Sequence, residues 1–356
     1  MWPYWILFLL PALAAFTAGT GPRAHLPQRQ ARWTPGWLFA AAATSLMIGL
    51  RYQVGGDWFN YLRYLETVQG ATLQEVVTMK DPGYRLLNWL SDELDWDIFG
   101  VNLVSGTIFT IGLACFCRSL PRPWLAFAVA VPYMVIVVGM GYTRQGVALG
   151  FAMLGLLALQ KRSIAWFVVW VVLGATFHRS AVLLLPIAAL ANSRNRYLTI
   201  GLVGVVTASA YFLLLQDSVD DLIENYIEAE YQSEGALVRL LMNAAPALVL
   251  LLFRRRFRFA PGESGLWLWL AVISLALLAG LLVSPSTTAL DRLGLYMLPL
   301  QLVVLSHLPS VFGSPGRANR AWVVAILAYC AAVQFVWLNY ASHSVAWKPY
   351  RFYLFE

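Results

Sequence analysis

Four arginines lie at the ends of long uncharged segments, where an ionised side chain is costly: Arg51, Arg144, Arg239 and Arg292. An arginine at membrane depth costs about 2.5 kcal/mol or more unless it is paired or hydrated. The planar guanidinium grips phosphate oxygens in pairs, which a lysine ammonium cannot do. We therefore expect the group to bind one anion, and a lipid-linked phosphate is the natural ligand. The alternative is that each arginine reaches lipid headgroups or pairs with Asp57 or Asp291.

His178 is the candidate proton acceptor among these residues. It follows a turn of small residues, Gly174-Ala175-Thr176-Phe177, and it precedes Arg179. An ordinary imidazole pKa of about 6.5 suits a general base or a donor to phosphate. The alternative is a hydrogen bond that joins two helices.

The triplet Asp95-Trp96-Asp97 has the spacing of an acidic pair that holds a metal and a diphosphate. Together with Asp92 and Glu93, it is better explained as a solvated acidic face before a helix that starts near Ile98. The sequence has no His-Glu-x-x-His, no paired Cys-x-x-Cys and no Gly-Lys-Ser/Thr phosphate loop. We expect neither a metal nor a cofactor.

The elements that must position these residues are membrane helices. Apolar residues make up 60% of the 356-residue chain and charged residues 12%, against about 25% charged in an ordinary soluble domain. A span needs about 20 apolar residues. Ten segments qualify: 1–20, 33–50, 98–117, 123–143, 145–160, 197–216, 237–253, 264–284, 289–306 and 321–340. The stretch 163–192 is either one long tilted span or two short helices, 163–176 and 180–192, and counting the two helices separately gives twelve segments. The expected fold is an all-α polytopic integral membrane protein, one transmembrane domain over 1–356.

The stretch 163–192 is divided into a short broken helix pair at Phe177-His178. A helix of 14 residues is about 21 Å long, shorter than a hydrocarbon core of about 30 Å. Two half-depth helices place His178 inside the protein at membrane depth, where irregular backbone must be shielded or line a wet cavity.

Charge predicts the sidedness of the chain. Fifteen of the 25 basic residues and one of the 18 acidic residues fall in the loops 21–32, 118–122, 161–162, 193–196, 254–263 and 307–320. The positive-inside rule makes these loops cytoplasmic and places both termini outside. Two outer segments are substantial, an amphipathic helical loop over 51–97 and an acidic loop over 217–236. Because basic membrane loops explain the net charge of +7, we expect no nucleic-acid partner.

Six motifs occur in order along the chain: Arg51…Gly56-Asp57-x-x-x-Tyr61, Asp81-Pro82-Gly83-Tyr84, Arg144-Gln145, Phe177-His178-x-Ser180, Asp291-Arg292-x-x-x-Tyr296 and Trp347-x-Pro349-Tyr350. In this order the chain resembles the EpsG-like family of bacterial membrane proteins, which is related to the Wzy polymerases of surface polysaccharides. The resemblance spans nearly the whole sequence. Gly146 stands where the family often has a larger residue.

The resemblance implies a polysaccharide polymerase of exopolysaccharide biosynthesis with a fold similar to the GT-C glycosyltransferases. Such an enzyme joins oligosaccharide repeat units carried on undecaprenyl diphosphate, at the outer face of the bacterial cytoplasmic (inner) membrane. Its implied partners are this lipid-linked oligosaccharide, membrane lipids, and a chain-length regulator and flippase of the same pathway. Fold similarity does not establish function, so these remain expectations.

The expected roles of the site residues follow from the leaving group. Arg51, Arg144 and Arg292 would bind the diphosphate, whose developing charge is stabilised best by preorganised cations. His178 or Asp57 would accept the proton of the sugar hydroxyl. Asp57 and Asp291 would orient the arginines or take that proton. Contacts to sugar or phosphate are expected from Tyr61, Tyr84, Tyr296 and Arg239.

Two other functions stay open from the sequence. An O-antigen-ligase-like transferase would use the same arginines and differ in its acceptor. A flippase or transporter of lipid-linked sugars fits twelve segments, but inverted repeats are absent and the polar residues gather at one face. An acyltransferase using a histidine would take its donor from the cytoplasm, whereas His178 is expected nearer the outside.

Overall fold

The computed structural model describes residues 1–18, 33–190, 235–260, 263–284, 287–314 and 317–356, and the single positions 201, 204, 205 and 208. The predicted loop 21–32 and almost all of the segments 197–216 and 217–236 lie outside the described residues. Every regular element in the described ranges is a helix, apart from one isolated β-bridge between Arg51 and Phe352. The all-helical expectation is confirmed.

The long apolar segments form a bundle. Its helices are α1 (Trp2–Thr17), α2 (Pro35–Gly49), α6 (Asp97–Ser119), α7 (Pro123–Ala130), α8 (Thr143–Gln160), α9 (Ile164–Phe177), α13 (Ala236–Leu252), α14 (Glu263–Gly280), α15 (Thr287–Leu295), α16 (Leu298–Val311) and α17 (Arg320–Tyr340). Shorter elements are the π-helix η2 (Val131–Gly139), the 3-10 helix η3 (Arg179–Leu184), α10 (Leu185–Leu190) and the 3-10 helices η6 (Ser342–Trp347) and η7 (Tyr353–Phe355). The loop 51–97 contains α3 (Trp58–Glu66), α4 (Leu73–Thr78) and α5 (Pro82–Glu93).

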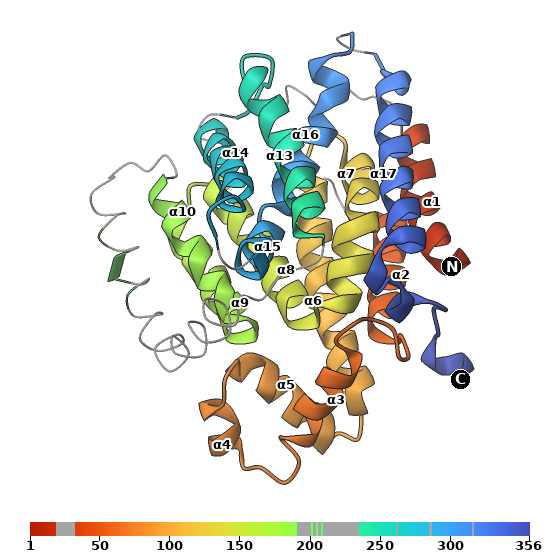
Figure 1. Ribbon diagram of the computed structural model, residues 1–356, viewed down its shortest axis with the longest axis vertical. Coiled ribbons are helices and arrows are strands. Elements are labelled where there is room, and N and C mark those ends of the chain that lie inside the picture. Colours follow the sequence, from red (N-terminus) through yellow and green to blue (C-terminus); the bar gives the residue numbers. More distant parts are fainter. Residues whose placement is uncertain are drawn as a thin grey trace.

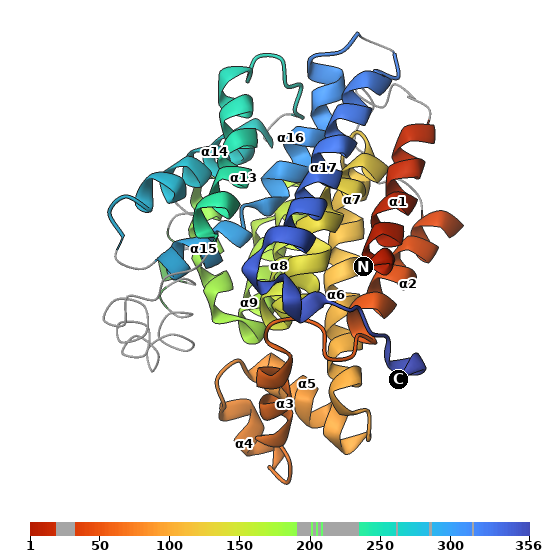
Figure 2. The ribbon, with the colours of Figure 1, turned by 45° about the vertical axis from the view of Figure 1, so that its right-hand side comes forward.

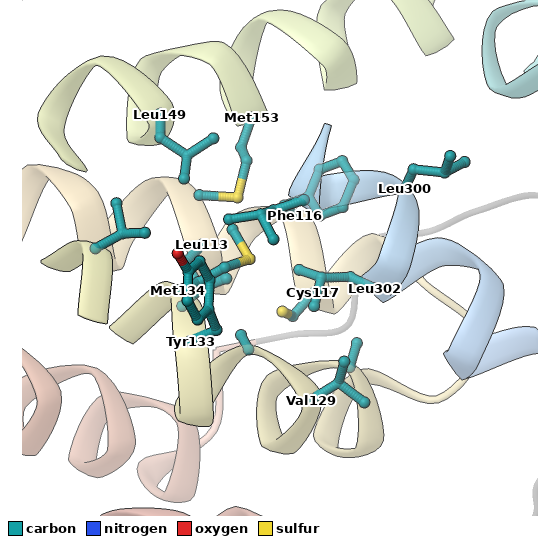
Figure 3. Packing of buried hydrophobic residues seen from close by; sticks show 14 of the residues in the cluster. Leu113, Phe116, Cys117, Val129, Tyr133, Met134, Leu149, Met153, Leu300 and Leu302 are labelled. Atoms are coloured by element: carbon teal, nitrogen blue, oxygen red, sulfur yellow. The ribbon is translucent and has the colours of Figure 1, made fainter. Parts of the chain in front are cut away.

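The core lies between α6, the α7–η2 unit, α8 and α16. Side chains from these four elements interdigitate, among them Phe116, Met134, Met153 and Leu302 (Figure 3). Close approach of α6 and α8 depends on glycine, because a Cβ on Gly112 would lie 2.3 Å from the carbonyl oxygen of Gly150. Inside a membrane, helices associate through close packing because water supplies no hydrophobic driving force between them. Small residues at the contact let the two backbones approach closely.

The helices run between two ends of the bundle. α3, α4 and α5 protrude at one end, on the same side as the C-terminus (Figure 1). The connections from α13 to α14 and from α16 to α17 lie at the opposite end in both views (Figures 1 and 2). The loops that charge assigns to opposite sides of a membrane, 51–97 and 254–263, therefore lie at opposite ends of the fold.

Among the described residues, three helices are long and apolar enough to cross a membrane: α6, α14 and α17. A fourth is obtained if α15 and α16 count as one span bent by 50°. Five shorter apolar helices are α1, α2, the α7–η2 unit, α9 and α13. The number of twelve segments therefore stays a prediction.

Two predicted segments are interrupted where the structure has a proline nearby. The single helix expected over 289–306 is wrong, since α15 ends at Leu295 and α16 restarts at Leu298. Pro299 has no N–H to donate to the carbonyl of Leu295, and the carbonyl of Gly294 accepts from the Met297 N–H at 3.0 Å and from Asn243 Nδ2 at 2.7 Å. The segment 123–143 becomes π-helical from Val131, next to Pro132, which removes a donor in the same way.

Candidate functional site

The loop 51–97 is fastened to the bundle by an aromatic cluster. Trp58, Tyr61 and Tyr84 are buried with Ile98 and Val101 at the start of α6. Tyr61 and Tyr84 were predicted to contact substrate, and both side chains are almost fully buried, with 3% and 0% of their surface exposed. The cluster therefore holds the loop 51–97 against the start of α6.

Arg51 is locked into the protein. Its side chain is fully buried, and its guanidinium donates to the carbonyl oxygens of Val54 at 3.0 Å and of Ile48. Nη2 also donates to Asn102 Oδ1 at 3.1 Å and to Thr143 Oγ1 at 2.8 Å. This arginine connects the end of α2 to α6 and to the start of α8, so it holds in place the helix that begins at Thr143 and carries Arg144.

Glycines close the turn that follows Arg51. Gly55 has a φ of +107°, and a Cβ there would lie 2.3 Å from the carbonyl oxygen of Met140. A side chain is therefore excluded by both conformation and space. The Gly55 N–H donates to the carbonyl of Ala346 at 2.9 Å, and Trp347 Nε1 donates to Ile136 O at 2.8 Å. Residues near the C-terminus thus contact this turn and the π-helix η2.

Arg144 and Asp81 form an ion pair at the entrance to the site. The distance from Arg144 Nη1 to Asp81 Oδ2 is 2.6 Å, and the side chains are 23% and 4% exposed. The guanidinium carbon of Arg144 lies 4.5 Å from the centre of the Tyr64 ring, and that of Arg85 lies 4.3 Å from it. Partial burial lowers the pKa of Arg85, and the charge of Arg144 lowers it further, while Tyr64 and Asp81 act in the opposite direction.

Gly83 brings α5 against the end of α9. A Cβ on Gly83 would lie 2.4 Å from Thr176 Oγ1 and 3.1 Å from Phe177 Cε2. Only glycine permits this approach without displacement of the neighbouring side chains. The contact places the Asp81-Pro82-Gly83-Tyr84 turn beside the residue that follows Phe177, which is His178.

His178 stands at the break between α9 and η3, where the sequence predicts an interrupted helix. Its backbone is extended, with φ −152° and ψ 108°, so α9 ends one residue earlier. The imidazole Nδ1 is buried and has no hydrogen-bond partner among the described residues. The charges of Arg144, Arg292 and Arg179 all act on this imidazole, and these arginines lie on α8, α15 and η3.

Asp291 is engaged by Arg239. Arg239 Nε lies 2.5 Å from Asp291 Oδ1, and Arg239 Nη2 lies 2.7 Å from Asp291 Oδ2. This two-point pair joins α13 to α15. The carbonyl oxygen of the next residue, Arg292, accepts from Gln145 Nε2 at 2.8 Å, which joins α15 to the start of α8.

Tyr296 separates the polar site from an apolar cavity. Its hydroxyl lies 3.0 Å from Ser180 Oγ, and the charges of Asp81 and Arg292 both act on it. On its other side is a cavity of about 250 Å³ lined by apolar residues of η3, α10, α14 and α15, together with Met297. A polar region and an apolar cavity thus meet at one side chain.

Electrostatic interactions connect several of the predicted residues, which differ in accessibility. Tyr142 is within the electrostatic reach of Asp57, Asp291, Arg239 and Arg292, and Tyr61 is within that of Asp57, Arg144 and Arg51. Sequence reasoning missed Asp81, Tyr64, Arg85 and Gln145 as site residues. Asp81 and Arg144 each stand in a recognised motif, but the sequence does not show that they pair across 63 positions.

In the described part of the chain, no three His, Cys, Asp or Glu side chains are grouped closely enough to hold a metal ion. The charged groups that do converge are guanidiniums and single carboxylates. Guanidiniums are groups that can bind an anion by charge-assisted hydrogen bonds.

The fold and site define an all-helical membrane protein with a cationic site at one end of its bundle. The family model of the EpsG family matches residues 37–352, and the chain belongs to this family. It is a Wzy-like polymerase family of polysaccharide-synthesising membrane proteins. No curated protein and no solved structure matches the chain.

Proposed function

We propose that this protein joins oligosaccharide repeat units that are carried on undecaprenyl diphosphate, at the outer face of the cytoplasmic membrane. The observation that carries the proposal is the partly exposed guanidinium of Arg144, which Asp81 holds at the turn that Gly83 packs against the end of α9, next to His178, in a chain of the EpsG family. Three cations that act on one half-buried histidine suit a substrate with several negative charges. A lipid-linked diphosphate has such a group beside the bond that must break.

In the proposed reaction, a hydroxyl of one repeat unit attacks the anomeric carbon of another. The bond between that carbon and the diphosphate oxygen breaks, and the electron pair leaves with the diphosphate. Arg144 and Arg292 bind this leaving group and stabilise its charge. His178 or Asp57 accepts the hydroxyl proton. Arg51, whose guanidinium is bonded to the protein throughout, contributes by holding the start of α8 in place.

The apolar cavity beside Tyr296 supports a lipid-linked substrate. A diphosphate at the arginines would place the first part of its lipid chain next to this cavity, and Leu183 on its rim is 52% exposed. Apolar surface removed from water is favourable by roughly 25 cal/mol per Å².

The test is polymer length, measured with purified protein, a lipid-linked repeat unit and a chelator. We expect a ladder of polymer without added nucleotide sugar or divalent ion. Transfer of a single glycan to a different acceptor would favour a ligase, and movement of the lipid across vesicles without polymer would favour a flippase. Activity that the chelator abolishes and a divalent ion restores would contradict the arginine-based account.

A further inference from the structure

The site contains two arginine–aspartate pairs with different geometry. The pair of Arg239 and Asp291 is two-pronged and engages both carboxylate oxygens, at 2.5 and 2.7 Å. The pair of Arg144 and Asp81 has one contact, at 2.6 Å. Asp81 Oδ1 is buried and has no hydrogen-bond partner in the described part of the chain. Buried polar atoms without a partner are uncommon in native proteins and ask for an explanation.

The guanidinium of Arg144 keeps most of its N–H groups available. Among the described residues, its hydrogen bonding is limited to the contact between Nη1 and Asp81, and the side chain is still 23% exposed. One edge is held by the carboxylate and the ring of Tyr64 lies 4.5 Å from the guanidinium carbon. Two supports on a planar group fix its orientation while leaving its other N–H groups for a ligand.

Asp81 is itself held firmly. Its φ of +55° is a left-handed conformation that costs a residue other than glycine about 1 kcal/mol or more. Pro82 follows, and Gly83 is pressed against Thr176 and Phe177. Strain of this kind persists only where the surroundings enforce it, and it is common at functional sites. The carboxylate therefore has little freedom to follow a moving partner.

We propose that Asp81 is a positioning residue, which aims Arg144 at the diphosphate of the lipid-linked donor. The inference rests on the proposed function. Asp81 holds one edge of the guanidinium, and Tyr64 supports its face. Arg239, by contrast, donates both of its bonds to the carboxylate of Asp291, so this pair joins α13 to α15.

The main variants are Asp81→Asn and Asp81→Glu, with Glu93→Gln as the matched control, because Glu93 is an exposed carboxylate at the far end of α5. We expect Asp81→Asn to lower kcat roughly tenfold to a hundredfold, since small displacements of a catalytic group have effects of that order. It should also weaken inhibition by inorganic diphosphate. Asp81→Glu should recover part of the loss, and Glu93→Gln should match the wild type.

A double variant separates positioning from packing. If Asp81 acts through Arg144, adding Asp81→Asn to Arg144→Lys should cost little beyond Arg144→Lys alone, because coupled residues are not additive. Multiplied losses would overturn the proposal, as would wild-type kcat and wild-type inhibition in Asp81→Asn. If Asp81→Asn does not fold, Tyr64→Leu removes the other support of the guanidinium and decides the question by the same kcat and inhibition measurements.

Binding of inorganic diphosphate keeps this proposal distinct from the proposed function. Diphosphate should raise the melting temperature of the wild type and of Glu93→Gln, and it should raise that of Asp81→Asn much less. This result would support the positioning role even if the wild type formed no polymer. Equal stabilisation of all three proteins would refute it even if polymer formed.

Discussion

Two arginines that look alike in the sequence have opposite environments. Arg51 is fully buried and donates to four protein oxygens, whereas Arg144 is partly exposed and donates to one carboxylate. The N–H groups of Arg51 are bonded within the protein and stabilise the fold, whereas most N–H groups of Arg144 remain available to a ligand. The consequences of substitution should therefore differ in kind between the two positions.

Arg144→Lys should reduce polymerisation nearly as much as Arg144→Ala. Lysine keeps the charge but loses the planar fork. Loss of one preorganised donor to developing charge typically costs about 2.7–4 kcal/mol, on the order of a hundredfold or more in rate. The measurement is the rate of polymer formation, with protein level as the control. Full polymer from Arg144→Ala would remove this arginine from the chemistry.

Arg51→Lys should instead destabilise the protein. A lysine cannot reach the oxygens of Asn102, Thr143 and Val54 together, and each buried acceptor left unpaired costs about 1–3 kcal/mol. We expect a lower melting temperature in detergent and a smaller amount of inserted protein. Arg63→Lys, on the exposed face of α3, is the matched control. A stable Arg51→Lys protein that is inactive would instead indicate direct contact with substrate.

At the scale of elements, the site depends on how closely α5 approaches α9. Gly83 and Thr176 are in contact across this junction, which brings the Asp81 turn beside His178. Two other irregular segments also carry tyrosines of the site. Tyr142 follows the π-helix η2, and Tyr296 lies in the break between α15 and α16. Interrupted helices thus deliver polar groups to one place, as is usual for irregular backbone inside membranes.

Gly83→Ala should lower activity because the added methyl group would increase the distance between α5 and α9. The added Cβ would lie 2.4 Å from Thr176 Oγ1, and overpacking of this kind costs about 1–3 kcal/mol. Adding Thr176→Ala removes that oxygen and should restore part of the polymer yield. Both the melting temperature and the yield should be measured. If Gly83→Ala is fully active, the close approach is not required for catalysis.

At the scale of the whole molecule, the two ends of the bundle differ in charge. The loop Arg254–Arg258 carries four arginines, and it lies at the end opposite to α3, α4 and α5 (Figure 1). The positive-inside rule makes this end cytoplasmic. The site would then face the outside, where a lipid-linked oligosaccharide is presented.

Labelling of single cysteines tests this sidedness. In a background without Cys115, Cys117 and Cys330, a cysteine at Glu356 should react with an impermeant reagent in intact cells. Cysteines at Arg255 and Arg317 should react only after the membrane is opened. A cysteine at Asp221, which is not among the described residues, should also react from the outer side of the membrane. Labelling of Arg255 from the outside would reverse the orientation and move the site to the cytoplasmic face.

The sequence by itself determined the features that depend on local chemistry. Long apolar runs specify helices, a small-residue turn followed by a polar pair marks the break at His178, and ordered motifs identify the EpsG family. Each of these signals lies within a few residues of the feature that it predicts.

Only the tertiary structure decided which side chains are partners. Arg144 pairs with Asp81 across 63 positions and Arg239 with Asp291 across 52, and Arg51 reaches Thr143 across 92. Nothing in the local sequence separates a buried arginine from an accessible one, since both follow apolar runs. Their roles depend on close approaches between distant helices, such as that of Gly83 to Thr176, which arise from packing in three dimensions.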